Sequence, residues 1–234
     1  MLILGKKYKK ILENPLKREN LDVLWLPDNQ YVDKRLAGHV DLSMLRLGDG
    51  RLMAAPYLIG SREVRYLIEM GLKVDTADIL QSENYPADAG LNMCVVGEYL
   101  IYDPAAAYKK AVDHLIKENG KIPIFCRQGY TRCSTCVVDG HSIITSDEGI
   151  AKAAGEGGLD VLKITPGHVI LDGFSYGFIG GATFSLPDGR LAFTGRLDKH
   201  PDKATIEIFL EQRNVQPVYL TDEEIFDIGG GICI

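Results

Sequence analysis

The sequence lacks the features that would direct it to a membrane or to a nucleic acid. No apolar stretch approaches the roughly 18–20 residues that a transmembrane helix needs. Clustered Lys and Arg are also missing, since the longest basic run is the short KKYKK at residues 6–10 and the net charge is −6. The missing apolar stretch means that no membrane is expected as a partner. Because phosphate backbones are bound by clustered positive charge, a nucleic acid is not expected either.

The sequence also lacks the cysteine pattern of a secreted or zinc-binding protein. Its five cysteines are an odd number, which does not suit a disulfide framework. CSTC at 133–136 is not matched by a second C-x-x-C or by a spaced His pair, so no metal is predicted. The first apolar run precedes the positive charges, the reverse of a secretory signal. We therefore expect a soluble cytoplasmic protein.

No linker or low-complexity segment interrupts the chain, and an internal repeat runs through it instead. NMCVVGEYLIYD at 92–103 matches STCVVDGHSIITSD at 134–147: each has Cys-Val-Val, a Gly-containing turn and an apolar strand. A helical pattern and another apolar strand follow each copy. DLSMLRLGDGRLMAAP at 41–56 and GATFSLPDGRLAFTG at 181–195 fit the same hairpin, with GDG and PDG as turns.

The repeat closes on itself. Its starts are spaced by 51, 42, 47 and 49 residues and lie at Asp41, Asn92, Ser134, Gly181 and Gly230. Counting from Gly230 through both chain ends back to Asp41 gives 45 residues, one more repeat, and 8–20 and 21–27 supply its helix and strand. The pattern predicts an α/β fold in which residues 1–234 form one domain, a ring of five ββαβ units closed by the terminal segments. An ordinary α+β domain is the alternative.

A fivefold ββαβ ring resembles the pentein family, which includes guanidino-group-modifying enzymes and a non-catalytic ribosome anti-association factor. The resemblance places the start of each repeat at a central pore, near 39–41, 92, 132–134, 180–181 and 227–230. The enzymes carry an acidic residue with paired glycines, then His-x-Asp, then a Cys nucleophile. Here Asp227 precedes His39 by 46 residues through the closure, and Cys133 follows His39 by 94. The cyclic order is kept, although the chain starts at a different point.

The resemblance implies a Cys-dependent hydrolase or amidinotransferase that acts on a small guanidino or amidino compound without a cofactor. Cys133 would be the nucleophile, His39 the acid and base, and Asp41 the residue that orients His39. Asp227, Asn92 and Arg132 would bind the substrate, and Arg132 would lower the thiol pKa if it points inward. The alternative is a non-catalytic pentein scaffold similar to the ribosome factor.

Other expectations concern the local structure. If the opening of the repeat is a strand, residues 133 and 136 lie on opposite faces, which leaves Cys136 in the core as the partner of Cys94. His39 and Asp41 would share one face of a strand. Cys233 in GGGIC is a rival nucleophile. Residues 57–61 or 196–203 could cover the pore, the two glycines at 180–181 allow close backbone approach, and Ser146 would cap a helix.

Overall fold

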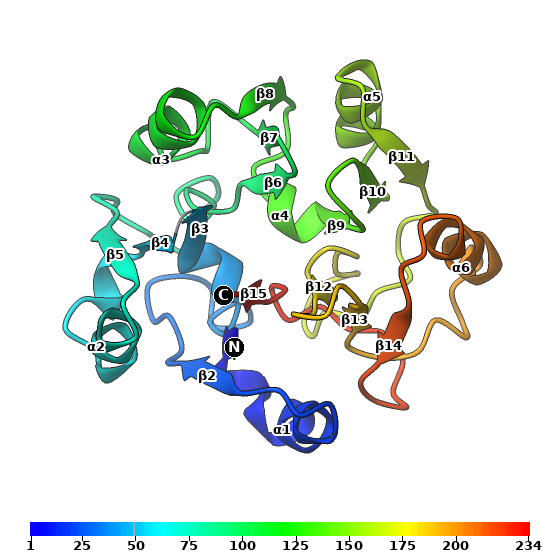
Figure 1. Cartoon of the computed structure of the whole chain (residues 1–234), viewed down its shortest axis with the longest axis horizontal. Coiled ribbons are helices and arrows are strands. Elements are labelled where there is room, and N and C mark those ends of the chain that lie inside the picture. Colours follow the sequence, from blue (N-terminus) through cyan, green and yellow to red (C-terminus); the bar gives the residue numbers. More distant parts are fainter. Residues whose placement is uncertain (49) are drawn as a thin grey trace.

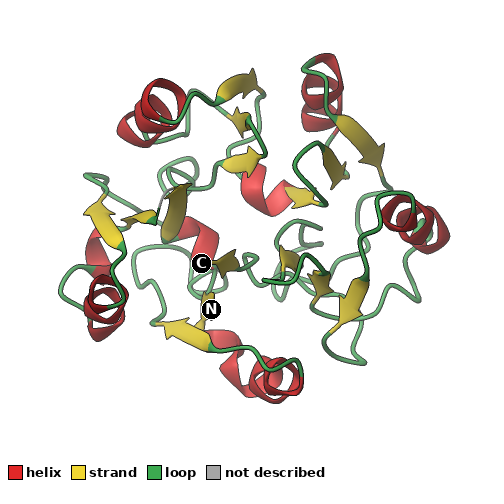
Figure 2. Ribbon diagram, in the orientation of Figure 1, coloured by secondary structure: helices red, strands yellow, loops and turns green. Residues whose placement is uncertain are grey.

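The strands form five small sheets arranged around a centre. The computed structural model describes residues 1–48 and 50–234, and within them five three-stranded sheets occur. The strands lie toward the middle of the molecule and most helices lie outside (Figures 1 and 2). In every sheet the first two strands are antiparallel and the third is parallel to the second. The predicted fivefold ββαβ ring is confirmed.

Each first strand begins one to three residues after its predicted start. The sheets are β3 (Met44–Gly48), β4 (Arg51–Ala54) and β5 (Lys73–Thr76); β6 (Cys94–Val96), β7 (Tyr99–Tyr102) and β8 (Ile122–Phe125); β9 (Thr135–Val137), β10 (Ser142–Thr145) and β11 (Asp160–Lys163); β12 (Thr183–Ser185), β13 (Leu191–Phe193) and β14 (Pro217–Tyr219); and β15 (Ile232–Cys233), β1 (Leu2–Gly5) and β2 (Val23–Leu26).

A helix connects the second and third strands of each sheet. These helices are α1 (Lys9–Arg18), α2 (Arg62–Glu69), α3 (Lys109–Asp113) with the π-helical turn η4 (His114–Glu118), α5 (Glu148–Glu156) and α6 (Lys203–Glu211). Shorter helical segments are η1 (Lys6–Tyr8), η2 (Val40–Leu42), η3 (Pro56–Leu58) and α4 (Thr131–Ser134).

The helix α5 corrects one local prediction. Its N-cap is Asp147, whose carboxylate accepts a hydrogen bond from the backbone N–H of Ile150 at 2.8 Å. Ser146 was predicted as the cap, but the helix begins one residue later, at Glu148, so the side chain that directly precedes the first turn is that of Asp147.

The hydrophobic core is divided among the contacts between neighbouring sheets. In one cluster Cys94 and Ile124, from the β6–β8 sheet, pack with Ile143 and Ile150 of the next unit. Cys136 packs in the following cluster, and both it and Cys94 have no exposed surface. The prediction that these two thiols are core residues is confirmed. Each sheet is thus stabilised by its neighbours, as expected for a ring whose units cannot bury an apolar face alone.

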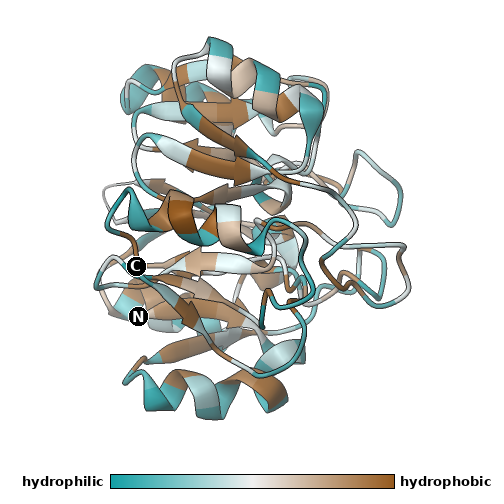
Figure 3. Ribbon diagram, turned by 90° about the vertical axis from the view of Figure 1, so that its right-hand side faces the viewer, coloured by the Kyte–Doolittle hydropathy of each residue, from teal (hydrophilic) through white to brown (hydrophobic). Residues whose placement is uncertain are grey.

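The two terminal segments complete the fifth sheet. Leu2 in β1 is paired antiparallel with Cys233 in β15 and parallel with Val23 in β2. In side view, loops project from one side of the ring (Figure 3). Over residues 1–48 and 50–234, no helix combines the length and the apolar character required to span a bilayer.

Candidate active site

His39 and Asp41 lie just before a strand and not within one. His39 has extended backbone angles, and Val40–Leu42 then form η2, with hydrogen bonds from the N–H of Leu42 to the His39 carbonyl and from Ser43 to Val40. The prediction that both side chains share one face of a strand is therefore wrong. These local bonds satisfy backbone groups of a buried segment before its pairing with β4 begins at Met44.

Cys133 also lies on a helical turn, since it belongs to α4, which directly precedes β9. Asn92 holds this turn in place from the preceding repeat. Its Oδ1 accepts hydrogen bonds from the backbone N–H of Arg132 at 2.8 Å and of Cys133 at 3.1 Å, and its Nδ2 donates to the Cys133 Sγ at 3.2 Å. Asn92 therefore fixes both the backbone and the sulfur of Cys133.

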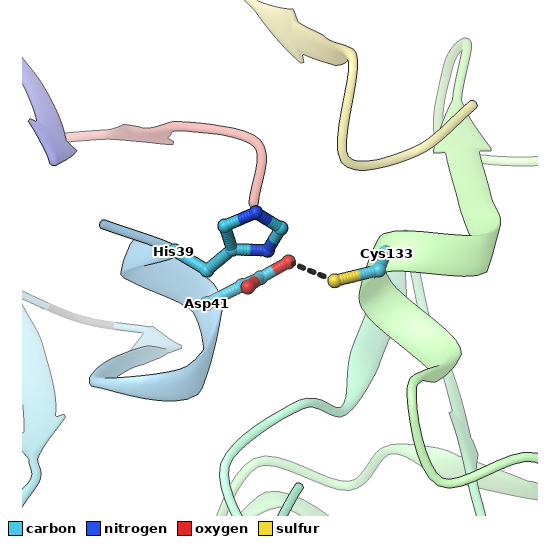
Figure 4. Close-up of side chains that lie close together, drawn as sticks. All are labelled: His39, Asp41 and Cys133. Atoms are coloured by element: carbon cyan, nitrogen blue, oxygen red, sulfur yellow. Dashed lines mark hydrogen bonds between the residues drawn. The ribbon is translucent and has the colours of Figure 1, made fainter. Parts of the chain in front are cut away.

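The side chains of His39, Asp41 and Cys133 meet in the buried centre of the ring (Figure 4). One imidazole nitrogen of His39, one carboxylate oxygen of Asp41 and the Cys133 sulfur all lie within 4.8 Å of one another. The Cys133 thiol donates a hydrogen bond to Asp41 Oδ2 at 2.8 Å. Asp41 Oδ1 and His39 Nε2 are buried without a hydrogen-bond partner among the described residues. Two buried polar atoms beside the thiol are therefore free to form a hydrogen bond.

The Asp227 carboxylate lies beside the imidazole nitrogen Nδ1 of His39. Its Oδ1 lies 3.9 Å from His39 Nδ1 and accepts a hydrogen bond from the N–H of Gly229, and its Oδ2 accepts one from the N–H of Phe178. A Cβ atom at Gly181 would come within 1.9 Å of Asp227 Oδ1. The close backbone approach expected at the paired glycines is confirmed at Gly180, where a Cβ would come within 2.3 Å of the Thr135 carbonyl oxygen, whereas Gly181 approaches the buried carboxylate of Asp227.

Burial sets the charge state of the site. Burial raises the pKa of Asp41 to about 7, the hydrogen bond from Cys133 opposes this rise, and the Asp227 carboxylate adds to it. Burial, followed by the charges of Asp41 and Asp227, raises the pKa of the Cys133 thiol well above its ordinary value. Burial also lowers the pKa of His39, while the Asp227 charge opposes this. Both shifts favour the uncharged form, the neutral thiol of Cys133 and the neutral imidazole of His39.

A cavity of about 270 Å³ leads to the cluster, and His39, Cys133 and Asp227 are among its lining residues. Its walls are apolar and come partly from the segment 171–178, which was not predicted as part of the site. Three aromatic residues alternate with Gly and Ser in FSYGF at 174–178, a composition that could have indicated a binding loop. Neither of the two segments predicted as covers, 57–61 and 196–203, contributes to this lining.

Arg132 and Cys233 line a different cavity, of about 300 Å³, whose lining also includes Asp41. The Arg132 guanidinium donates to the backbone carbonyls of Thr135, Gly180 and Thr183 at 3.0–3.3 Å. Its positive charge lowers the pKa of Asp41 and is not among the causes that shift the thiol. Arg132 therefore links the backbones of two neighbouring repeats, and its role in substrate binding stays a prediction.

The three central residues also form a set that could close on a metal ion. A thiolate, an imidazole nitrogen and a carboxylate oxygen are typical ligands of catalytic Zn²⁺, with a fourth position left to solvent or substrate. The compactness and burial of His39, Asp41 and Cys133 suit such an ion, which the sequence did not predict.

The fold has solved counterparts. DDAH from Pseudomonas aeruginosa, in a cysteine-to-serine variant complexed with citrulline, is 11% identical with a TM-score of 0.53, covering 90% of this chain and 81% of that one. A C. jejuni agmatine deiminase is 12% identical with a TM-score of 0.56, covering 93% and 85%. A dimethylarginine dimethylaminohydrolase adduct with 4-chloro-2-hydroxymethylpyridine is 12% identical with a TM-score of 0.55, covering 93% and 90%.

These likenesses show that the chain has the pentein fold. More narrowly, the chain belongs to a family of unknown function, DUF6873, whose model matches residues 3–232. No curated protein matches the sequence. The structural neighbours are guanidino-group hydrolases and deiminases.

Proposed function

We propose that the protein is a cysteine-dependent hydrolase of a small guanidinium or amidinium compound, with Cys133 as the nucleophile. The observation that carries this proposal is the meeting of His39, Asp41 and Cys133 at the end of a cavity that Asp227 also lines. The names of the structural neighbours, among them an agmatine deiminase, support the same class of substrate.

The electrostatics of the site favour a cationic ligand. Two carboxylates, Asp41 and Asp227, are each less than 5% exposed, and their mutual repulsion raises the pKa of Asp41 further than burial alone. Their charges also oppose ionisation of Cys133. A planar cation beside them offsets that repulsion and stabilises a thiolate at the same time. Substrate binding therefore supplies the charge that activates the nucleophile.

The reaction follows from these positions. The Cys133 proton passes to Asp41, to which the thiol is already hydrogen bonded. Asp41 Oδ1 and His39 Nε2 are both without a partner, and the proton reaches His39 when these two atoms close to hydrogen-bond distance around the substrate. The imidazolium then lies beside Asp227. The sulfur attacks the amidinium carbon, a C–S bond forms, and one C=N electron pair moves to nitrogen. His39 protonates the departing amine or ammonia as the C–N bond breaks, which leaves on sulfur an amidino group from a guanidinium substrate or an imidoyl group from an amidinium substrate.

Water completes the cycle. His39, now neutral, removes a proton from a water molecule whose oxygen attacks the carbon of the covalent adduct. The C–S bond then breaks, the electron pair returns to sulfur, and the proton held by His39 returns to the thiol. One substrate cation and one water thus yield a ureido or amide product and an ammonium ion. An amine in the place of water would make the same site an amidinotransferase.

A pair of matched electrophiles tests the proposal. Chloroacetamidine carries the cation and chloroacetamide is its neutral isostere. We expect the rate ratio of amidine to amide to be at least about a hundredfold higher at Cys133 than at the half-buried Cys233, because one unit charge near two buried carboxylates is worth a few kcal/mol. Peptide mapping separates the two thiols, and Cys133→Ser identifies the signal. Equal ratios at both thiols would refute the proposal.

The raised thiol pKa favours one competing function, a non-catalytic scaffold that keeps the ring and uses no reactive thiol. The same measurement separates the two. A scaffold predicts that Cys133 is labelled slowly by both electrophiles, whereas the hydrolase predicts selective labelling by the cation. Release of ureido product from simple guanidines, lost in Cys133→Ser, would then establish turnover.

A further inference from the structure

The walls of the cavity differ in chemistry from its inner end. His39, Cys133 and Asp227 provide the imidazole, thiol and carboxyl groups of the lining. The wall residues are predominantly apolar or aromatic, and among the described residues the lining contains no Lys or Arg: Leu36, Leu42, Tyr130, Leu171, Phe174, Tyr176 and Phe178, with Ser175. A ligand whose cationic group reaches the thiol therefore places its substituent against apolar side chains.

An amino-acid substrate would leave its charges unpaired in this cavity. The α-carboxylate of an arginine needs a cation, and burial of an unpaired charge is strongly unfavourable. Arg35 stacks on the ring of Phe174, with its Cζ 4.0 Å from the centroid, but its guanidinium is already occupied. It donates to both carboxylate oxygens of Asp33 and, at 2.6 Å, to the carbonyl of Gly173. Arg35 therefore anchors the 171–178 segment.

A polar group on the wall itself, the hydroxyl of Tyr130, is similarly engaged. The Tyr130 hydroxyl donates to Asp88 Oδ2 at 2.5 Å, so its ring and not its oxygen is available to a ligand. The ring of Phe178 lies 6.4 Å from that of Tyr130 and 6.3 Å from that of Tyr176, the second pair being perpendicular. Such an arrangement presents both faces and edges of aromatic rings, which suits an aromatic or alkyl substituent next to a delocalised cation.

The geometry points to a substrate in which a guanidinium or amidinium group carries an apolar substituent, aromatic or short alkyl, and no α-amino-acid end. This inference rests on the proposed function and specifies its substrate class. The cavity of about 270 Å³ is slightly below the roughly 300–1,000 Å³ usual for small-molecule sites, so the substituent is no larger than about one ring.

Binding to the Cys133→Ser protein, measured by calorimetry, tests the substrate class without depending on turnover. The ligands are benzylguanidine, methylguanidine, agmatine and L-arginine. We expect benzylguanidine to bind at least about tenfold more tightly than arginine or agmatine. A tenfold change in affinity corresponds to about 1.4 kcal/mol, and burial of one aromatic ring contributes more binding free energy than that. Tighter binding of arginine or agmatine would overturn the inference, as would binding of none of the four.

A variant pair locates the preference. Tyr176→Ala should weaken benzylguanidine binding by at least about fivefold and leave methylguanidine binding unchanged, because only the larger ligand reaches the wall. Tyr66→Ala is the matched control, since Tyr66 on α2 is similarly exposed and lies outside this cavity. An equal loss in both variants, or an equal loss for both ligands, contradicts the inference.

Turnover by the wild-type protein keeps the two proposals distinguishable. Hydrolysis of arginine in preference to benzylguanidine would refute the substrate class and leave the proposed function intact. Tight binding of benzylguanidine without hydrolysis of any guanidine, and without selective labelling by chloroacetamidine, would refute the function and support the ligand class.

Discussion

The Asp41→Asn substitution tests the electrostatic description of the site through protein stability. In the folded protein the pKa of Asp41 is raised to about 7 from an ordinary value of 3.8. The folded state therefore holds a proton that the unfolded state releases between these values. The contribution of Asp41 to the free energy of unfolding therefore has its full value below about pH 3.8. It falls by about 1.36 kcal/mol per pH unit as the pH rises toward 7.

The structure gives the size of the effect. A difference of about three pH units corresponds to at most about 4 kcal/mol, a large fraction of the stability of a typical domain. The asparagine side chain of the variant cannot ionise, and it keeps an oxygen that can accept the hydrogen bond from Cys133. Relative to wild type, the variant should therefore gain up to about 4 kcal/mol in the free energy of unfolding between about pH 4 and pH 7.5.

Urea unfolding at several pH values, followed by the fluorescence of the single tryptophan, Trp25, measures this difference. Asp78→Asn is the control, because the Asp78 side chain is 91% exposed. A difference between Asp41→Asn and wild type that does not change with pH would refute the reasoning. So would a wild-type protein that gains stability relative to the variant as the pH rises, since Asp41 would then be ionised in the folded state.

Two further predictions concern other residues of the site. Gly181→Ala should destabilise the fold by about 1–3 kcal/mol in urea unfolding, because the new Cβ would overlap Asp227 Oδ1. The control Gly155→Ala has open space on helix α5 and should be neutral or stabilising. Equal stability of the two variants would contradict the prediction. Equimolar Zn²⁺ should slow the labelling of Cys133 by chloroacetamidine, and His39→Asn should reduce that protection; labelling that is insensitive to Zn²⁺ would show that the three ligands do not close on an ion.

The repeat pattern was sufficient to predict the ring, but not the conformation at the start of each unit. Hairpins and helices of ordinary length have a periodic pattern of hydrophobic residues, so the sequence predicted the order strand, strand, helix, strand in each unit correctly. Turns of three or four residues, such as η2 and α4, carry no period and depend on tertiary contacts. The helical turn around Cys133 depends on Asn92, 41 residues earlier in the chain, and sequence spacing does not reveal such a bond.

These short turns also explain why the side-chain arrangement differed from the expectation. Successive residues on a helical turn point in directions about 100° apart, so Arg132 can face the backbone of the next repeat while Cys133 faces the centre. For the same reason Asp41 reaches the sulfur, and the carboxylate beside His39 is that of Asp227. The sequence predicted that Asp41 orients the imidazole of His39 and that Asp227 binds the substrate cation. The geometry instead pairs Asp41 with the thiol.

The closure of the ring explains how the site can be assembled from a chain that starts at a different point. His39 and Asp227 are 188 residues apart in sequence, yet their side chains approach within 3.9 Å. This proximity depends on the fifth sheet, in which β1 and β15 come from opposite ends of the chain. Once that sheet forms, each unit contacts two neighbours and the order of central residues becomes cyclic. The position of the termini then has no bearing on which side chains meet, so a motif order that looks rotated along the sequence can give the same spatial arrangement.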